Sequence, residues 1–432
     1  MRGLTSEGSF HPSMNVRQAL FLSLVDATTA SPGKSSSATT SPGLQSSSSE
    51  GGAGLAYGVD ENSNPFIYFS TADGAFDLNS GTPPNTDAAD TFVKIPANLS
   101  TIGTGYFQGS PSPFFTPSDQ LYRGIYCPGP PPGPLNDVDF GSAGTMLIPD
   151  TTLSGGVYAV KSDKLNYLWV MDRGGTTTGP GGYNTGTSTY SCASDPSYSC
   201  TCSSCSACPT TDWKNGNVNG PIPPHPGHST FTGTHSTAAF WGGNTGGTIN
   251  GGGTIVGNVF FAPVQGEIYD LPVSSNCGSG NGNVVCNTYI GITNTGTGHC
   301  PDRTFGCLGY SGTPSVSSNG VGSNANGIVW AVDTPAGNTA KDLRLYSFNA
   351  VPSGTTLNTL YDSNSECLGN TTGNIGPAPN HPVPTVANGL VFVGESCQPN
   401  STYKPAVCPG GGSNTSYLAI FGLHAPGTCP GP

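Results

Sequence analysis

Five short apolar runs recur along the chain, and each is introduced by residues that form turns. The runs are NPFIYFSTADG (64–74), GGVYAVKSDKLNYLWVMDRGG (155–175), GNVFFAPVQGEIYDL (257–271), NGIVWAVDT (326–334) and NGLVFVGES (388–396). Alternating β-branched and aromatic residues between Gly, Asn, Asp and Pro are typical of β-strands. Because the same unit recurs, the sequence predicts one strand-rich supersecondary element repeated along the chain.

Glycine and proline exclude a mostly helical alternative. The chain has 64 Gly and 39 Pro among 432 residues, and both residue types are unfavourable inside helices. Only 9% of the residues are charged, against about 25% in ordinary soluble domains, so Ser, Thr, Asn and Gly must form most of the surface. Aromatic residues also reach 9%, which excludes disorder driven by charge. We therefore expect an all-β protein with an apolar core.

The spacing of the runs favours a β-propeller. Their starts lie roughly 90–100 residues apart early in the chain and roughly 60–70 apart later, which indicates a unit enlarged by insertions. Repeats of about 40–50 residues are typical of propeller blades, which are four-stranded antiparallel sheets buried only by their neighbours. About five such blades are recognisable, with long disulfide-rich loop insertions. A pair of β-sandwiches is the alternative architecture.

Composition also predicts the boundaries of the parts. Residues 1–53 are rich in Ser, Gly and Pro and are expected to be largely disordered. The propeller is expected over 54–424, with a Gly/Ser/Cys-rich insertion at 174–234 and a short tail at 425–432.

The charge balance limits the partners. Thirteen Lys and Arg against 25 Asp and Glu give a net charge of −12. Binding to nucleic acid requires cations that displace counterions from phosphates, so nucleic acid is not an expected partner. The longest apolar stretches are far shorter than the roughly 20 residues that span a bilayer, so no membrane span is expected. A protein or carbohydrate ligand is the expected kind of partner.

Fourteen cysteines, an even number, indicate an oxidising compartment in which disulfides persist. We therefore expect an extracellular or periplasmic protein, although the sequence contains no clear signal peptide. The disulfide candidates are Cys127, Cys192, Cys200, Cys202, Cys205, Cys208, Cys277, Cys286, Cys300, Cys307, Cys367, Cys397, Cys408 and Cys429. Pairs Cys277–Cys286 and Cys300–Cys307 would close short loops, whereas spacing does not determine the complete connectivity.

Two groups of residues could bind a metal ion, as an alternative to disulfides for the cysteines and to structural roles for the histidines. Cys202-x₂-Cys205-x₂-Cys208 is similar to part of an iron–sulfur ligand run, and tetrathiolate zinc is a further alternative for the cluster around it. His225, His228 and His235 also lie close enough in sequence to share one metal ion.

Several strings resemble consecutive blades of one known family. HPVPTVANGLVFVGE (381–395), TPSVSSNGVGSNANGIVWAVD (313–333) and LNDVDFGSAGTMLIPD (135–150) resemble repeats of the pyrroloquinoline-quinone-like (PQQ-like) β-propellers, in the quinoprotein alcohol dehydrogenase-like superfamily. Rings of that family usually have more blades than the five visible here. The resemblance therefore implies that N-terminal blades are lacking, that residues 1–53 replace them, or that a partner chain or an oligomer completes the ring.

The resemblance also implies a set of site residues. In the family's dehydrogenases, PQQ lies over a calcium ion on the propeller axis, and the protein supplies oxygen ligands, a basic Asp and a cation. By motif, Asp73 corresponds to the calcium ligand and Asp139 to the catalytic base, with Asp137 nearby. Lys164 corresponds to the cation beside the quinone. Each of these residues has a structural alternative, because Asp commonly closes turns and Lys is commonly solvated.

The sequence departs from the family's enzymes in two ways. No two cysteines are adjacent, so the family's Cys-Cys pair is absent, and the calcium-binding Glu upstream of residue 54 has no counterpart. We therefore expect a non-catalytic binding or scaffold module. The alternative is a PQQ- and calcium-dependent oxidoreductase acting on alcohols or sugars, and a weaker third hypothesis is a calcium-dependent propeller hydrolase such as a phytase.

Overall fold

The computed structural model describes the chain in segments. These are residues 20–25, 32–38, 55–60, 62–72, 90–98, 114–116, 140–149, 153, 157–164, 168–173, 235–249, 252–262, 267–277, 284–286, 289–293, 312–320, 326–333, 342–363, 375–377, 382–396 and 416–422. Strands dominate these segments, and a single 3₁₀ turn, η2 (Phe140–Ser142), is their helical element. None of the described helical residues forms a helix with the length and apolar character that a bilayer crossing requires.

Five antiparallel sheets follow one another along the chain, and we call them blades 1 to 5. Blade 1 contains β3 (Ala56–Val59), β4 (Pro65–Ser70), β5 (Phe92–Pro96) and β6 (Phe114–Phe115), and blade 2 contains β7 (Thr145–Leu147), β8 (Tyr158–Ser162) and β9 (Leu168–Asp172). Blade 3 contains β10 (Ala239–Trp241), β11 (Gly257–Phe261), β12 (Tyr269–Val273) and β13 (Gly291–Thr293). Blade 4 contains β14 (Ser315–Ser318), β15 (Gly327–Asp333), β16 (Asp342–Asn349) and β18 (Thr359–Asp362), and blade 5 contains β20 (Thr385–Ala387), β21 (Leu390–Ser396) and β22 (Ser416–Phe421).

Three shorter pairings lie outside this regular pattern. Strand β17 (Thr356–Leu357) pairs in parallel with β13 and so ties the β16–β18 connection to blade 3. Strand β19 (Ile375–Pro377) pairs with the start of β16. Within the N-terminal segment 1–53, β1 (Leu20–Val25) and β2 (Pro32–Ala38) form a separate two-stranded sheet. The predicted limits of the domains stay predictions.

Each of the five apolar runs of the sequence contains the second strand of one blade, and the runs 155–175 and 257–271 also extend into the third strand. The second strands are β4, β8, β11, β15 and β21. Each has a hydrogen-bonded strand on both sides and packs against neighbouring blades, so β8 and β11 are buried along their whole length. This burial on both faces explains why the second strands are rich in apolar residues.

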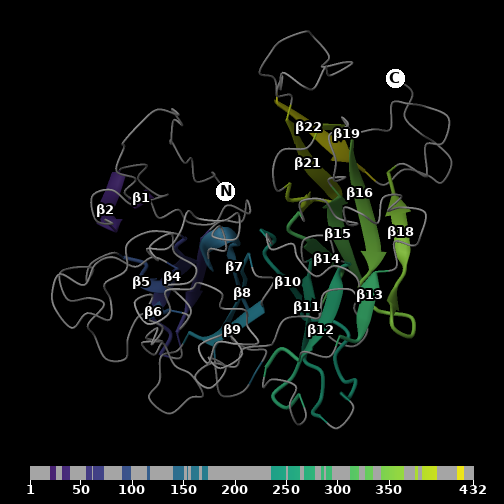
Figure 1. Ribbon diagram of the computed structural model, residues 1–432, viewed down its shortest axis with the longest axis horizontal. Helices are drawn as coiled ribbons and strands as arrows, with labels where there is room; N and C mark the ends of the chain where they lie inside the picture. Colours follow the sequence, from purple (N-terminus) through teal and green to yellow (C-terminus); the bar gives the residue numbers. More distant parts are fainter. Residues whose placement is uncertain are drawn as a thin grey trace, which may run out of the picture.

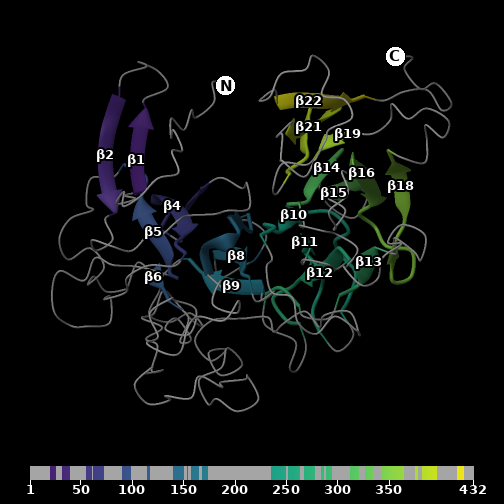
Figure 2. The ribbon, with the colours of Figure 1, turned by 45° about the horizontal axis from the view of Figure 1, so that its top comes forward.

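The first strands bring the blades together. Contacts join β3 to β7, β7 to β10, β10 to β14 and β14 to β20, so each blade meets the next through its first strand. Figures 1 and 2 show the resulting series, which runs from blade 1 on the left to blade 5 at the upper right. Successive antiparallel sheets that pack side by side through their innermost strands are the building principle of a β-propeller. The prediction of an all-β chain of antiparallel blades is therefore confirmed.

Apolar side chains fill the space between consecutive blades. Tyr68 and Phe92 of blade 1 pack with Trp169 of blade 2, and the corresponding clusters lie between blades 2 and 3, 3 and 4, and 4 and 5. Among the described residues, these clusters form four sheet-to-sheet interfaces. Fully burying one large apolar side chain contributes roughly 1.5–3 kcal/mol, so each interface depends on a handful of residues.

One predicted disulfide lies within the described residues. Cys277 and Cys286 are bonded and pack with Ile249 and Ile255 beside blade 3, which confirms that prediction. The other twelve cysteines lie outside the described residues, as do His225 and His228.

Candidate functional site

Three of the four predicted site residues, Asp73, Asp137 and Asp139, lie outside the described residues. The fourth, Lys164, follows β8 in the turn toward β9 and is only 3% exposed. In an antiparallel blade, the end of the second strand lies beside the beginning of the first strand. We call this end of each blade the entry end, and Lys164 lies at the entry end of blade 2.

Blades 1 and 2 are joined at their entry ends through Asp90. The Asp90 amide donates to the Ala72 carbonyl oxygen at 3.0 Å, and the Phe140 amide donates to Asp90 Oδ1 at 2.8 Å. Gly141 lies so close to the backbone of Thr71 and Ala72 that a Cβ atom would overlap with it. The residue before Asp73 and the residue after Asp139 are therefore neighbours in space.

The sequence-based reasoning did not single out Asp90. Its φ of 49° is in the left-handed region, which Asp and Asn tolerate better than most residues, and its side chain is completely buried. The sequence signal for the turn was an Asp shortly before a β-strand, whereas the contact itself had no sequence signal. The importance of Asp90 comes from this contact with Phe140, 50 residues further along the chain.

A buried lysine and a buried aspartate stabilise the entry end of blade 2. Lys161 Nζ donates to the carbonyl oxygens of Ala143 at 2.8 Å and Ser162 at 3.1 Å, and lies 4.9 Å from the centroid of the Phe140 ring. Trp169 Nε1 donates to Asp163 Oδ2 at 2.6 Å. These charged side chains are therefore bound to groups of the protein itself.

Short hydroxyl side chains continue this network through the later blades. Gly144 N donates to Thr237 Oγ1 at 2.8 Å, and Thr237 N donates to Thr313 Oγ1 at 2.9 Å. Ser315 Oγ in turn donates to the Pro384 carbonyl oxygen. Each contact joins the start of one first strand, or the segment before it, to the segment before the next first strand. Thr237 before β10 and Thr313 before β14 were the sequence signal for this network.

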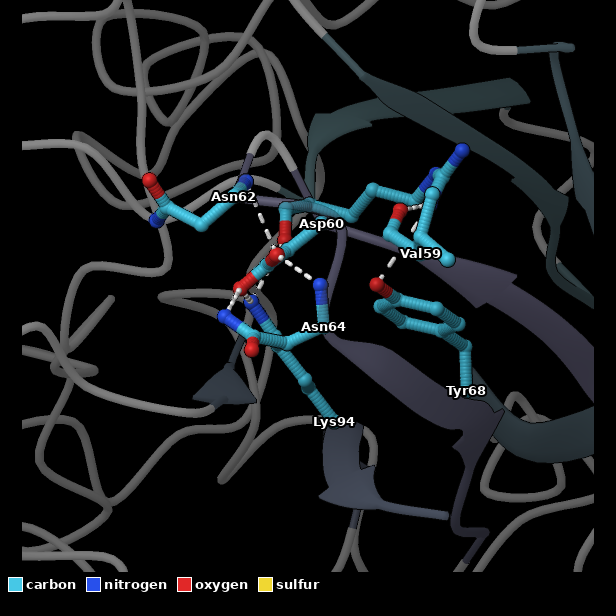
Figure 3. Close-up of polar contacts among 7 residues, drawn as sticks. Val59, Asp60, Asn62, Asn64, Tyr68 and Lys94 are labelled. Carbon is cyan, nitrogen blue, oxygen red and sulfur yellow. Dashed lines mark hydrogen bonds and ion pairs between the residues drawn. The ribbon is translucent and has the colours of Figure 1, made fainter.

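A second polar cluster joins blades 1 and 2 at the opposite end (Figure 3). Asp60 Oδ1 accepts hydrogen bonds at 2.9 Å from the amides of Asn62 and Asn64, which closes the β3–β4 turn. Lys94 Nζ lies 3.7 Å from Asp60 Oδ2 and donates to the Arg173 carbonyl oxygen at 3.0 Å. Because Lys94 belongs to blade 1 and Arg173 follows β9 of blade 2, the hydrogen bond between them crosses the interface.

Arg173 reinforces the same interface. Its Nη1 donates to the Val59 carbonyl oxygen and to the Tyr68 hydroxyl, and its guanidinium lies 5.3 Å from the Tyr68 ring centroid. The side chain is 1% exposed. We therefore assign a structural role to this cluster of Asp60, Lys94 and Arg173.

The interior between blades 3 and 4 holds an unusual polar pair. Asn258 Nδ2 donates to Asp270 Oδ1 at 2.7 Å, and both side chains are completely buried. Burial raises the pKa of the Asp270 carboxyl from 3.8 to about 8, and the hydrogen bond from Asn258 opposes this shift only in part.

The described residues contain no group of three or more His, Cys, Asp or Glu side chains arranged to bind a metal ion. The predicted calcium ligand Asp73 is not among those residues, so its role stays a prediction. His235, the described member of the predicted histidine group, is 9% exposed and opens the segment before β10.

Comparisons with known proteins give distant structural likenesses. No protein-family model matches the chain, and no curated protein matches it. Two matching solved structures are quinohemoprotein alcohol dehydrogenases, one from Pseudomonas putida (10% identity, TM-score 0.30) and one from Comamonas testosteroni (11% identity, TM-score 0.30). The matches cover 79% and 87% of this chain but 44% and 49% of the enzymes, so the chain spans less than half of their length.

Proposed function

We propose that the protein is an exported, non-catalytic binding or scaffold module of the PQQ-like β-propeller type. The observation that carries this proposal is the state of the charged groups at the entry end of blade 2. Lys161 and Asp163 are fully buried, and both are hydrogen-bonded to the protein. The Cys277–Cys286 disulfide supports export to an oxidising compartment.

A bound cofactor requires hydrogen-bond donors and acceptors from the protein. A binding site presents polar groups whose partners are exchangeable water molecules, so that a ligand can replace that water. Lys161 instead directs its ammonium group to two backbone carbonyl oxygens and an aromatic ring face. Withdrawing it for a cofactor would leave buried carbonyl groups without donors, which is energetically unfavourable.

The alternative is a PQQ- and calcium-dependent oxidoreductase acting on alcohols or sugars. It is supported by the contact of Asp90 with both Ala72 and Phe140, because these two residues border the predicted ligand Asp73 and the predicted base Asp139. Under this hypothesis PQQ would accept the electrons of substrate oxidation. Asp139 would take the hydroxyl proton, Asp73 would hold calcium with Asp137 nearby, and Lys164 would contact the quinone.

Titration with PQQ and calcium distinguishes the two hypotheses. Purified protein would be titrated with PQQ in the presence of calcium, followed by quinone absorbance, and then assayed for dye-linked oxidation of alcohols and sugars. The binding-module proposal predicts no saturable absorbance change and no turnover. Saturable binding with turnover that Asp139→Asn abolishes, and that a Gly320→Ala control retains, would contradict it and establish the oxidoreductase.

A further inference from the structure

The outer face of blade 5 carries exposed apolar side chains. Register places Ala387 beside Leu390, and Phe392 beside Ile420, so these side chains share one face with Leu418. Leu418 is 58% exposed and Ile420 is 56% exposed, and Leu390 and Ala387 are exposed as well. The five residues Ala387, Leu390, Phe392, Leu418 and Ile420 are called the outer face of blade 5 below. Thr385 and Gly394 complete this face, and none of the seven residues is charged.

The opposite face of the same blade is buried against blade 4. There Val391 and Val393 pack with Val332 and Leu345, and Ala419 and Phe421 lie beside them. Alternation along β21 and β22 therefore separates a buried apolar face from an exposed apolar face. Solvated sheet faces are normally polar, so a second apolar face indicates a second packing surface.

The repeated architecture indicates what kind of structure covers such a face. At each of the four interfaces in the chain, one blade presents an apolar sheet face to an apolar sheet face of the next blade. The outer face of blade 5 is the equivalent surface, one step further along the series. The matching partner is therefore another uncharged, apolar sheet face.

A second copy of the chain can supply that sheet in one way. Head-to-tail packing would use the outer face of blade 1, but Phe69, Val93, Ile95 and Phe114 on that face are each at most 4% exposed, and Tyr57 at its edge, 68% exposed, is the large apolar side chain that stays open there. Most of that face is therefore already covered, so the open apolar sheet that a second copy offers is the same face of blade 5. A surface that packs against its own equivalent closes around a two-fold axis and does not continue into a filament.

We propose that the outer face of blade 5 is a dimer interface, on which two copies of this chain pack sheet against sheet. Its lack of charge favours this partner, because two copies that each carry a net charge of −12 can meet there without opposing like charges. Repulsion between the remaining acidic surfaces then weakens the dimer at low ionic strength. Added salt screens that repulsion and tightens the dimer. The inference does not depend on whether a cofactor binds at the entry end.

Sedimentation velocity over a concentration series tests the proposal. Wild-type protein is expected to show a reversible monomer–dimer equilibrium that shifts toward the dimer as salt is added. Leu418→Lys and Ile420→Lys are each expected to raise the dissociation constant about 100-fold or more, because each places a charge in the centre of the interface. Leu360→Lys is the matched control, since Leu360 on β18 is 50% exposed and lies outside this face.

A second measurement does not depend on the folding of the variants. Hydrogen exchange of wild-type protein, followed over a dilution series, should show protection of residues 416–422 that increases with concentration, while residues 359–362 stay unchanged. A monomer at every concentration up to about 100 µM would overturn the proposal. A dimer that Leu360→Lys weakens as strongly as Leu418→Lys would overturn it as well, as would a complex formed only with a different protein.

Discussion

Asn258 and Asp270 form a 2.7 Å hydrogen bond in the interior between blades 3 and 4, where both side chains are completely buried. Asp270 Oδ2 and Asn258 Oδ1 accept no hydrogen bond in the structure. When Asp270 is ionised, both of these oxygen atoms can only accept hydrogen bonds. When Asp270 is protonated, its carboxyl group has an O–H that can donate one. The pair is thus better satisfied when Asp270 carries a proton.

This pair makes folding stability depend on pH. The pKa of Asp270 is about 8 in the folded protein, against 3.8 for an exposed carboxyl group. Between these values the folded state binds more protons than the unfolded state, so the free energy of unfolding falls as pH rises, by at most about 1.4 kcal/mol per pH unit. The contribution is complete below about pH 4 and is lost as pH approaches 8. Thermal unfolding at pH 5, 7 and 9 should show this decline, and Asp270→Asn should flatten it. The same slope in both proteins would contradict the assignment.

Gly141 should not tolerate a side chain. A Cβ atom there would overlap with the backbone of Thr71 and Ala72, and no flexible side chain end can move aside. Gly141→Ala is therefore expected to lower the free energy of unfolding by about 1–3 kcal/mol, as overpacking commonly does. Gly320→Ala is the control, because a Cβ at Gly320 meets nothing within 4 Å and the free energy should change by less than about 0.5 kcal/mol. Denaturant titration measures both, and equal effects would argue against the close contact.

Lys94 should be important for the contact between blades 1 and 2. Lys94→Met removes the buried partner of Asp60 and the donor to the Arg173 carbonyl oxygen. The expected loss is about 3–5 kcal/mol, because the Asp60 carboxylate stays buried without its counter-charge. Thermal and chemical unfolding measure this loss. Asp60→Asn should restore part of it in the Lys94→Met background, and a double variant no more stable than the single variant would contradict the ion pair.

The Cys277–Cys286 disulfide should contribute modest stability. The bond closes a short loop, with a sequence separation of 9, and chain entropy alone predicts about 2–3 kcal/mol for a loop of that size. The Cys277→Ala/Cys286→Ala double variant should therefore unfold at a lower temperature than oxidised wild type. Mass spectrometry of a non-reduced digest should recover the two peptides as one linked species, and their linkage to other cysteines would refute the pairing.

Sequence patterns predicted the elements that depend on local chemistry. The second strands β8 and β11 were recognisable because strands buried on both faces are rich in apolar residues, although β8 also contains Lys161 and β11 contains Asn258. The disulfide of Cys277 with Cys286 was recognisable because the two residues are close in sequence. The first strands carried a weaker signal, since β14 (Ser315–Ser318) has Val316 as its one apolar residue among three serines.

The candidate site could be predicted only in part. A motif placed Lys164 beside a quinone, but nothing in that motif indicated that its neighbours Lys161 and Asp163 would be fully buried. Burial depends on the packing of Phe140 and Trp169, which come from separate segments of the chain. The sequence likewise contains Asp90 without any sign that it joins Ala72 to Phe140.

The sequence by itself thus determined an all-β chain of repeated antiparallel units, because strand periodicity and turn residues act over a few neighbouring positions. Tertiary structure alone decided which charged groups are buried, that Gly141 lies against the backbone of another blade, and that the outer face of blade 5 is exposed. Those properties arise where two blades meet or where a blade has no described neighbour. Leu418 and Val393 are both ordinary apolar strand residues in the sequence, and only the position of blade 4 makes one of them core and the other surface.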